Sequence, residues 1–262
     1  MKTFSQTTSR TAHWSIDCHV HLFDEVSMLK NIPEKCICFA DIDLNKPILY
    51  QNIYQLYNKY WDKIPKGCTM LSTGMTINDI KQVYFDHPRD IKGFGELKLY
   101  DRLNGQPVNY KSCDLVKEVL EFSHSVGDLP VYIHFMLEDS KDVDDVTGFA
   151  LNFPSVPIVL CHSGINNQSD AGYSWAQAVA LANKHNNIWL EISWSSLLYI
   201  HDYPFLLDQV PKDRIIMGSD RSPFGDRSLH PTNTHEDIQK KIHDLCEWRD
   251  WDGNLKRLFP SV

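Results

Sequence analysis

Two histidines spaced two residues apart, His19 and His21, end the apolar run 14–21. Side chains two apart on a β-strand point to the same side of a sheet, so the two imidazoles are expected to converge. Neutral imidazole is the commonest side-chain ligand for transition metals in proteins. The pair therefore predicts one corner of a metal site, provided that other metal-type ligands end neighbouring strands.

Four further apolar runs carry polar side chains of the required kind near their C-terminal ends. They are Glu96 and Lys98, again two residues apart, His134, His162 and Asp220. A polar group at the end of a buried strand is costly to desolvate unless it is paired or bound to a metal. Each residue alone has an ordinary interpretation as a core histidine or a helix-capping carboxylate. Five strand ends with such residues together indicate a shared site.

The apolar runs themselves predict the fold. Eight short, mostly β-branched runs predict strands over residues 15–21, 35–42, 68–75, 91–99, 130–136, 157–162, 188–193 and 214–220. Amphipathic stretches between them predict helices, of which the clearest cover residues 47–64, 112–126, 171–185 and 234–248. Alternating strands and helices predict an α/β protein with a parallel sheet, and eight units favour a closed (β/α)8 TIM barrel. An open sheet would usually carry a glycine-rich phosphate loop after an early strand, and none follows here.

Composition and charge limit the classes of protein and of partner that are compatible with the sequence. Hydrophobic residues make up 42% and charged residues 23% of the 262 residues, as in an ordinary globular protein. No internal linker is visible, so we expect an N-terminal arm over 1–13 and a single barrel domain over 14–262. The net charge of −8 argues against nucleic acid as a partner, because Lys and Arg dominate binding to phosphate backbones.

Cysteine usage and the absence of long apolar runs suggest a location. Seven cysteines without CxxC pairs indicate a reducing compartment. Residues 1–13 lack the apolar stretch of a secretory signal, and no run reaches the roughly 18 apolar residues of a membrane span. We therefore expect a cytoplasmic protein without a membrane partner. Barrels of this kind often pair, and the aromatic helix 50–61 offers a face for a homo-oligomer.

The order of the candidate ligands resembles the amidohydrolase superfamily of metal-dependent barrels. The matching features are His-x-His on the first strand, His on the fifth and sixth strands, and Asp on the eighth. The segments 218–223 (Gly-Ser-Asp-Arg-Ser-Pro) and 253–259 look like the amidohydrolase-2, or amidohydrolase-related, branch. The segment 95–99 (Gly-Glu-Leu-Lys-Leu) is instead similar to TatD-type deoxyribonucleases, in which the fourth-strand Glu binds metal.

This resemblance implies one or two divalent metal ions, with Zn as the default and Mn, Fe or Ni also compatible with imidazole and carboxylate ligands. The implied ligands are His19, His21, Glu96, His134, His162 and Asp220. In a two-metal site Glu96 would bridge the ions and His162 would bind the second one, with a carbamylated Lys98 as the alternative bridge. In a one-metal site His162 would contact substrate or act as a base. A structural Glu96–Lys98 ion pair is a third interpretation.

The implied activity is hydrolysis of a small-molecule amide, ester or lactone by metal-activated water. Asp220 would accept the proton of the water, and Asp220 or His162 would return it to the leaving group. Lys98, Trp194 and Arg221 follow or end strands and are candidate substrate-binding residues. Two alternatives remain open: a TatD-like phosphodiesterase, and a non-oxidative decarboxylase of the amidohydrolase-2 type.

Overall fold

The computed structural model describes residues 17–22, 36–40, 69–71, 76–89, 91–98, 100–103, 106–109, 113–165, 170–193, 196, 199–200, 203–218 and 251–260. For Lys98, the first three strands and the segments between 100 and 109, the description covers the backbone path. The predicted arm 1–13 and the predicted helices 47–64 and 234–248 lie outside these residues. The division into an arm and one domain stays a prediction.

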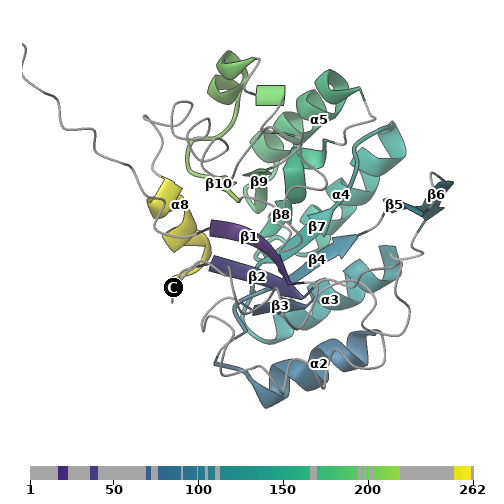
Figure 1. The fold of residues 1–262 in the computed structure, drawn as a ribbon, viewed down its shortest axis with the longest axis vertical. Helices are drawn as coiled ribbons and strands as arrows, with labels where there is room; N and C mark the ends of the chain where they lie inside the picture. Colours follow the sequence, from purple (N-terminus) through teal and green to yellow (C-terminus); the bar gives the residue numbers. More distant parts are fainter. Residues whose placement is uncertain are drawn as a thin grey trace, which may run out of the picture.

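Eight short parallel strands form the centre of the protein (Figure 1). They are β1 (Asp17–Leu22), β2 (Cys36–Ala40), β3 (Thr69–Leu71), β4 (Phe94–Lys98), β7 (Val131–His134), β8 (Ile158–Leu160), β9 (Ile188–Ile192) and β10 (Ile215–Met217). Each strand overlaps one of the eight predicted ranges. The apolar, β-branched runs therefore identified each barrel strand in the part of the chain that the structure describes.

The strands follow one another around the sheet in chain order. One parallel ladder contains β1, β2 and β3, and a second contains β4, β7, β8, β9 and β10. Where the ladders meet, β3 lies beside β4 and β10 lies beside β1, so the order closes on itself. A closed order of eight parallel strands with helices outside is a (β/α)8 barrel, as predicted.

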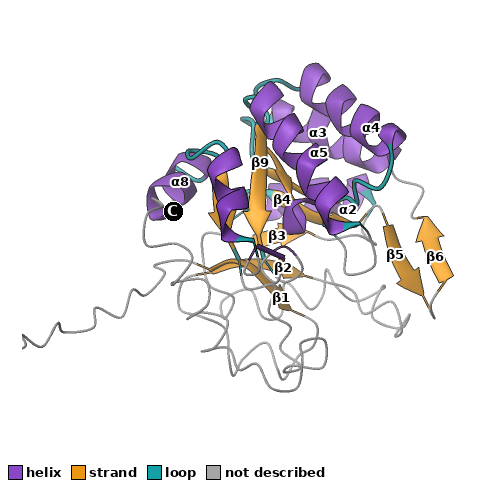
Figure 2. Ribbon diagram, turned by 90° about the horizontal axis from the view of Figure 1, so that it is seen from above, coloured by secondary structure: helices purple, strands orange, loops and turns teal. Residues whose placement is uncertain are grey.

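Four helices pack side by side against the outer face of the strands (Figure 2). They are α2 (Ile77–Asp86), α3 (Cys113–Ser125), α4 (Ser140–Asn152) and α5 (Ala171–Lys184). α3 and α5 confirm the predicted helices 112–126 and 171–185. α2, α4 and α5 each begin at a capping side chain, because oxygens of Thr76, Asp139 and Asp170 accept backbone N–H groups of the first turn. None of the described helices is long and apolar enough to cross a membrane.

A hairpin interrupts the alternation of strands and helices between β4 and α3. β5 (Tyr100–Leu103) and β6 (Gln106–Asn109) pair in antiparallel fashion directly after the strand that carries Glu96. The two intervening residues are Asn104 and Gly105, a sequence that strongly favours a tight type I′ turn. The hairpin was not predicted, although this dipeptide signals it.

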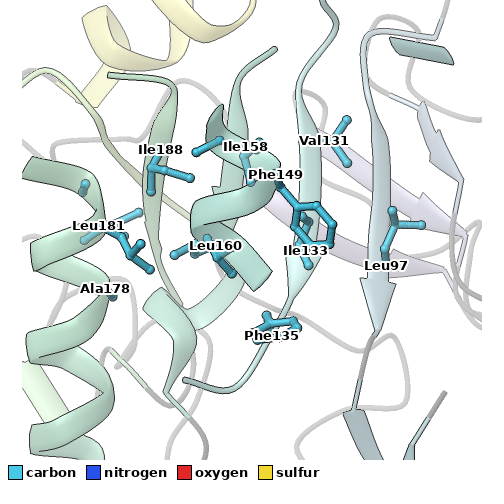
Figure 3. Close-up of a cluster of buried hydrophobic side chains, with 14 of the residues drawn as sticks. Leu97, Val131, Ile133, Phe135, Phe149, Ile158, Leu160, Ala178, Leu181 and Ile188 are labelled. Carbon is cyan, nitrogen blue, oxygen red and sulfur yellow. The ribbon is translucent and has the colours of Figure 1, made fainter. Parts of the chain in front are cut away.

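Two apolar layers cover the two faces of the strands. Side chains such as Ile133, Leu160 and Leu181 fill the space between the strands and the outer helices (Figure 3). On the inner face, side chains including Tyr132 and Val159 pack against the C-terminal helix α8 (Trp251–Leu258) and the phenylalanine that follows it. Burial on both faces is the reason why these strands are almost continuously apolar.

α8 closes the end of the barrel at which the strands begin. The side chain of Asn254 is fully buried, and its Nδ2 donates to the carbonyl oxygens of Lys212 at 2.9 Å and Ile215 at 2.8 Å. Because Ile215 is the first residue of β10, these bonds fix α8 beneath the barrel. Glu96, His134 and His162 lie toward the opposite, C-terminal end of the strands.

A half-buried arginine, Arg214, joins α5 to the sheet near the same lower end. Arg214 Nη1 donates to the carbonyl oxygens of Ala182, of His185 at 2.8 Å and of Ile188 at 3.4 Å. Burial lowers the pKa of Arg214, whereas the carboxylate of Asp213 acts in the opposite direction. The guanidinium thus satisfies carbonyls at the end of α5 and the start of β9. The short helix η5 (Pro204–Gln209) follows β9 and precedes β10.

Candidate metal centre

Glu96, His134 and His162 come together on β4, at the end of β7 and just after β8. His134 Nδ1 lies 2.6 Å from Glu96 Oε1, and His162 Nε2 lies 3.5 Å from the same oxygen. The potential ligand atoms of all three residues lie within 4.8 Å of one another. The two imidazole rings meet edge to face, with 4.9 Å between their centroids. Three of the six predicted metal ligands therefore share one place in the fold.

Glu96 reaches this place because β4 is irregular. In the ladder with β7 the register shifts between Phe94 and Leu97, and both of these side chains join the apolar layer beneath the outer helices. The extra residue turns Glu96 to the other face, where the residue is 1% exposed. Gly95 permits this path, since its φ is +127° and a Cβ there would lie 2.4 Å from the carbonyl oxygen of Tyr132.

His162 lies in a tight turn, because β8 ends at Leu160 and is followed by the short helix η4 (Cys161–Gly164). The backbone of His162 and Ser163 is left-handed, with φ values of 52° and 53°. Glu191 holds this turn in two ways. Its Oε2 accepts the backbone N–H of His162 at 3.1 Å, and its backbone carbonyl accepts a bond from Ser163 Oγ at 2.9 Å. The predicted strand 157–162 therefore extends two residues past the C-terminal end of β8.

The arrangement fits a divalent metal ion. Imidazole nitrogens and a carboxylate oxygen are ligands suited to Zn, Mn, Fe or Ni. His162 Nδ1 lies 2.7 Å from Ser193 Oγ, so Nε2 is the nitrogen that faces Glu96. Histidines that bind metals usually have the second ring nitrogen held in this way. A buried carboxylate beside two imidazoles also favours a cation, which would balance its charge.

The remaining candidates are placed by their backbone or lie outside the described residues. β1, which carries the His-x-His pair, lies beside β10, the strand that precedes Asp220. Lys98 pairs with His134 in the ladder of β4 and β7. Outside the described part of the chain are the side chains of His19, His21 and Lys98 and the whole of Trp194, Asp220 and Arg221. Their roles stay predictions.

Sequence analysis overlooked two residues of this site, Glu191 and Ser193. Both interrupt the apolar run 188–193 at a spacing of two, which is the same pattern as the pair His19 and His21. Both residues are fully buried, and both form hydrogen bonds with His162. The two polar residues in the apolar run 188–193 were therefore a signal from which these site residues could have been predicted.

The sequence of the C-terminal half agrees with this geometry. Residues 125–251 match the family model described as Amidohydrolase. The matched stretch includes His134 and His162 and extends past Asp220. The chain is therefore similar in sequence to this family over its C-terminal half. This match supports the resemblance drawn from the order of the ligands, whereas residues 95–99, which carry the TatD-like detail, lie outside it.

Solved structures with similar folds span nearly the whole chain. A probable 2-pyrone-4,6-dicarboxylic acid hydrolase from Acinetobacter baumannii, with citric acid bound, has a TM-score of 0.59 at 17% identity, covering 94% of this chain and 98% of that one. A dihydroorotase from Saccharomyces cerevisiae, in complex with 5-fluoroorotic acid, has a TM-score of 0.55 at 15% identity, covering 93% and 81%. A 2,6-dihydroxybenzoate decarboxylase from Rhizobium has a TM-score of 0.50 at 11% identity, covering 94% and 98%. These likenesses show the shared barrel fold. No curated protein matches the chain in sequence.

Proposed function

We propose that this protein belongs to the amidohydrolase superfamily and is a metal-dependent hydrolase that uses metal-activated water on a small-molecule amide, ester or lactone. The observation that carries the proposal is the meeting of Glu96, His134 and His162 within 4.8 Å. In barrels of this kind the active site lies at the C-terminal ends of the strands, where this cluster is found. A carboxylate and two imidazoles gathered there are expensive to bury without a functional reason.

One or two divalent ions, with Zn as the default, would be held by His19, His21, Glu96, His134, His162 and Asp220. When bound, such an ion lowers the pKa of its water toward about 7 and polarises the substrate carbonyl. Among the described ligands, Glu96 supplies an anionic oxygen and His162 offers Nε2, because Ser193 engages Nδ1. This division of roles between the two ring nitrogens supports a ligand role for His162.

The proton transfers belong to side chains of the protein itself. Asp220 accepts the proton of the attacking water, and Asp220 or His162 delivers it to the leaving group. Lys98, Trp194 and Arg221 bind the substrate, and the guanidinium of Arg221 suits a carboxylate or phosphate. The partner is therefore a small molecule. We also place the enzyme in the cytoplasm, because seven cysteines without CxxC pairs are typical of a reducing compartment.

The number of ions decides the role of Glu96. In a two-metal site Glu96 would hold both ions, with a carbamylated Lys98 as the alternative residue in that role. In a one-metal site Glu96 instead fixes His134, which it already approaches at 2.6 Å, and His162 acts on the substrate. A one-metal site with Arg221 as the anion-binding residue also suits a non-oxidative decarboxylase. The alternative of a TatD-like phosphodiesterase is supported by the sequence of residues 95–99 alone.

Metal content and reaction products test the proposal together. Elemental analysis of the purified protein gives the number of ions, and reconstitution of chelated protein with Zn, Mn, Fe or Ni precedes a screen of p-nitrophenyl esters, lactones, amides and phosphodiesters. Substitution His134→Ala should remove bound metal and hydrolysis, whereas the control His124→Ala, on the exposed face of α3, should retain both. Protein that binds no metal and cleaves nothing in any form would refute the proposal. Release of CO2 from hydroxybenzoates by a one-metal form would favour the decarboxylase.

A further inference from the structure

Two side chains hold His162. Glu191, in β9, binds its backbone, and Ser193, directly after β9, binds its imidazole ring. Ser193 Oγ lies 2.7 Å from Nδ1 of the ring, and Glu191 Oε2 lies 3.1 Å from the backbone nitrogen. Both holding side chains are fully buried, and His162 is 4% exposed. Water therefore has little access to this group of bonds, and the protein determines their geometry.

The backbone beneath the ring would be unfavourable without such support. Left-handed φ values of 52° at His162 and 53° at Ser163 cost roughly 1–2 kcal/mol per residue in L-amino acids. Such conformations persist where surrounding contacts determine them, and they gather at functional sites. Glu191 provides two of these contacts, one from its carboxylate to His162 and one from its carbonyl to Ser163.

The position of Ser193 is itself fixed. Its backbone N–H donates to Ser196 Oγ at 3.0 Å, and the same hydroxyl donates to the carbonyl oxygen of Ser193 at 2.8 Å. Ser196 is also fully buried. The hydroxyl of Ser193 is thus presented to the ring from a closed turn, which makes it a suitable fixed partner for one ring nitrogen.

We propose that Ser193 and Glu191 are positioning residues that make His162 a metal ligand through Nε2. With an ion bound, Ser193 would accept a hydrogen bond from Nδ1–H, which leaves the Nε2 lone pair, on the side of Glu96 3.5 Å away, for the ion. Glu191 holds the turn that brings the ring to this place. The inference rests on the proposed function, because it assigns His162 to the metal in preference to a role as a free base.

Metal affinity of matched serine variants tests the inference. Loss of a group that orients a metal-binding histidine typically weakens metal binding about 10- to 100-fold, and this loss is expected for Ser193→Ala. Ser123→Ala is the control, because it removes an equally buried hydroxyl, which donates to the carbonyl oxygen of Leu129 and has no bond with His162 or its turn. It should weaken binding by less than about tenfold. Competition with a chromophoric chelator for Co or Zn gives both affinities, and Ser193→Thr, which keeps the hydroxyl, should restore most of the loss.

The tautomer can be observed directly without any change at Ser193. Long-range proton–nitrogen correlation spectra of the Zn-loaded, ¹⁵N-histidine-labelled wild-type protein should show a protonated Nδ1 on His162 and a metal-shifted Nε2, with the resonances assigned from their absence in His162→Gln. A Zn-loaded protein in which Nε2 keeps its proton, or equal losses of affinity in Ser193→Ala and Ser123→Ala, would overturn the inference. Wild-type protein that binds no metal would instead refute the proposed function.

Discussion

Replacing Gly95 with alanine tests how β4 brings Glu96 to the site. The new Cβ would lie 2.4 Å from the carbonyl oxygen and 2.8 Å from the Cβ of Tyr132, distances that force a shift of the strand. The φ of +127° adds backbone strain of about 1–3 kcal/mol, and forcing an extra methyl into a packed site adds about 1–3 kcal/mol. The free energy of unfolding should therefore fall by about 2–6 kcal/mol.

The same substitution should weaken metal binding. Relief of the overlap moves β4 away from β7, and Glu96 follows Gly95 directly in the chain. The 2.6 Å approach of Glu96 Oε1 to His134 Nδ1 would lengthen, so the ligand atoms would no longer share one site. Chelator competition on the folded variant measures this second effect independently of stability.

Gly148→Ala provides the matched control. Gly148 lies within α4, and a Cβ there would meet no atom within 4 Å. Alanine in a helix interior is favoured over glycine by about 0.8–1 kcal/mol, so this variant should be slightly more stable than the wild type. Urea denaturation followed by tryptophan fluorescence compares both variants. A Gly95→Ala protein with wild-type stability and metal affinity would refute the argument that the strand irregularity positions Glu96.

Three further predictions concern stability. Arg214→Ala should lower the free energy of unfolding by about 3 kcal/mol, because charged hydrogen bonds to buried carbonyls are lost, and Arg214→Lys should recover part of it in urea denaturation. Asn254→Ala should cost about 2–4 kcal/mol in the same assay, because the buried carbonyl of Ile215 and the partly buried carbonyl of Lys212 lose their donor. Burial, together with the neighbouring Lys184 ammonium, lowers the pKa of His185. The folded protein then binds fewer protons there than the unfolded chain, so stability should fall as pH drops below about 6.5, and His185→Gln should flatten this dependence. If His185→Gln and the wild-type protein lose the same free energy of unfolding between neutral and acidic pH, that role of His185 is contradicted.

The strands could be predicted because each is buried on two faces. A strand covered by helices outside and by the barrel interior inside must be apolar throughout, and such runs stand out in a sequence. The polar residues that interrupt their ends then become informative. Glu96, His134 and His162 were identified for this reason, and the closed order of strands brings them together.

The turn at His162 could not be predicted from local sequence. Nothing in the segment Cys161-His-Ser-Gly indicates that two L-residues adopt left-handed backbone, since only Gly164 favours it intrinsically. The conformation depends on Glu191, a residue distant in the sequence. The hairpin of β5 and β6 was missed for a different reason, because its strands are short and polar although the Asn-Gly turn between them is a strong signal.

The two ends of the barrel contribute separately to stability and to the metal site. Asn254 and α8 act at the end where the strands begin, and the inner apolar layer that contains Tyr132 and Val159 packs against that helix. A ligand that binds only the folded state raises the free energy of unfolding by RT ln(1 + [L]/Kd), which is about 2.7 kcal/mol at one hundred times Kd. If Asn254→Ala leaves the site intact, metal should stabilise this variant and the wild type by the same increment. Unequal increments would show that the lower end of the barrel also shapes the ligand geometry above it.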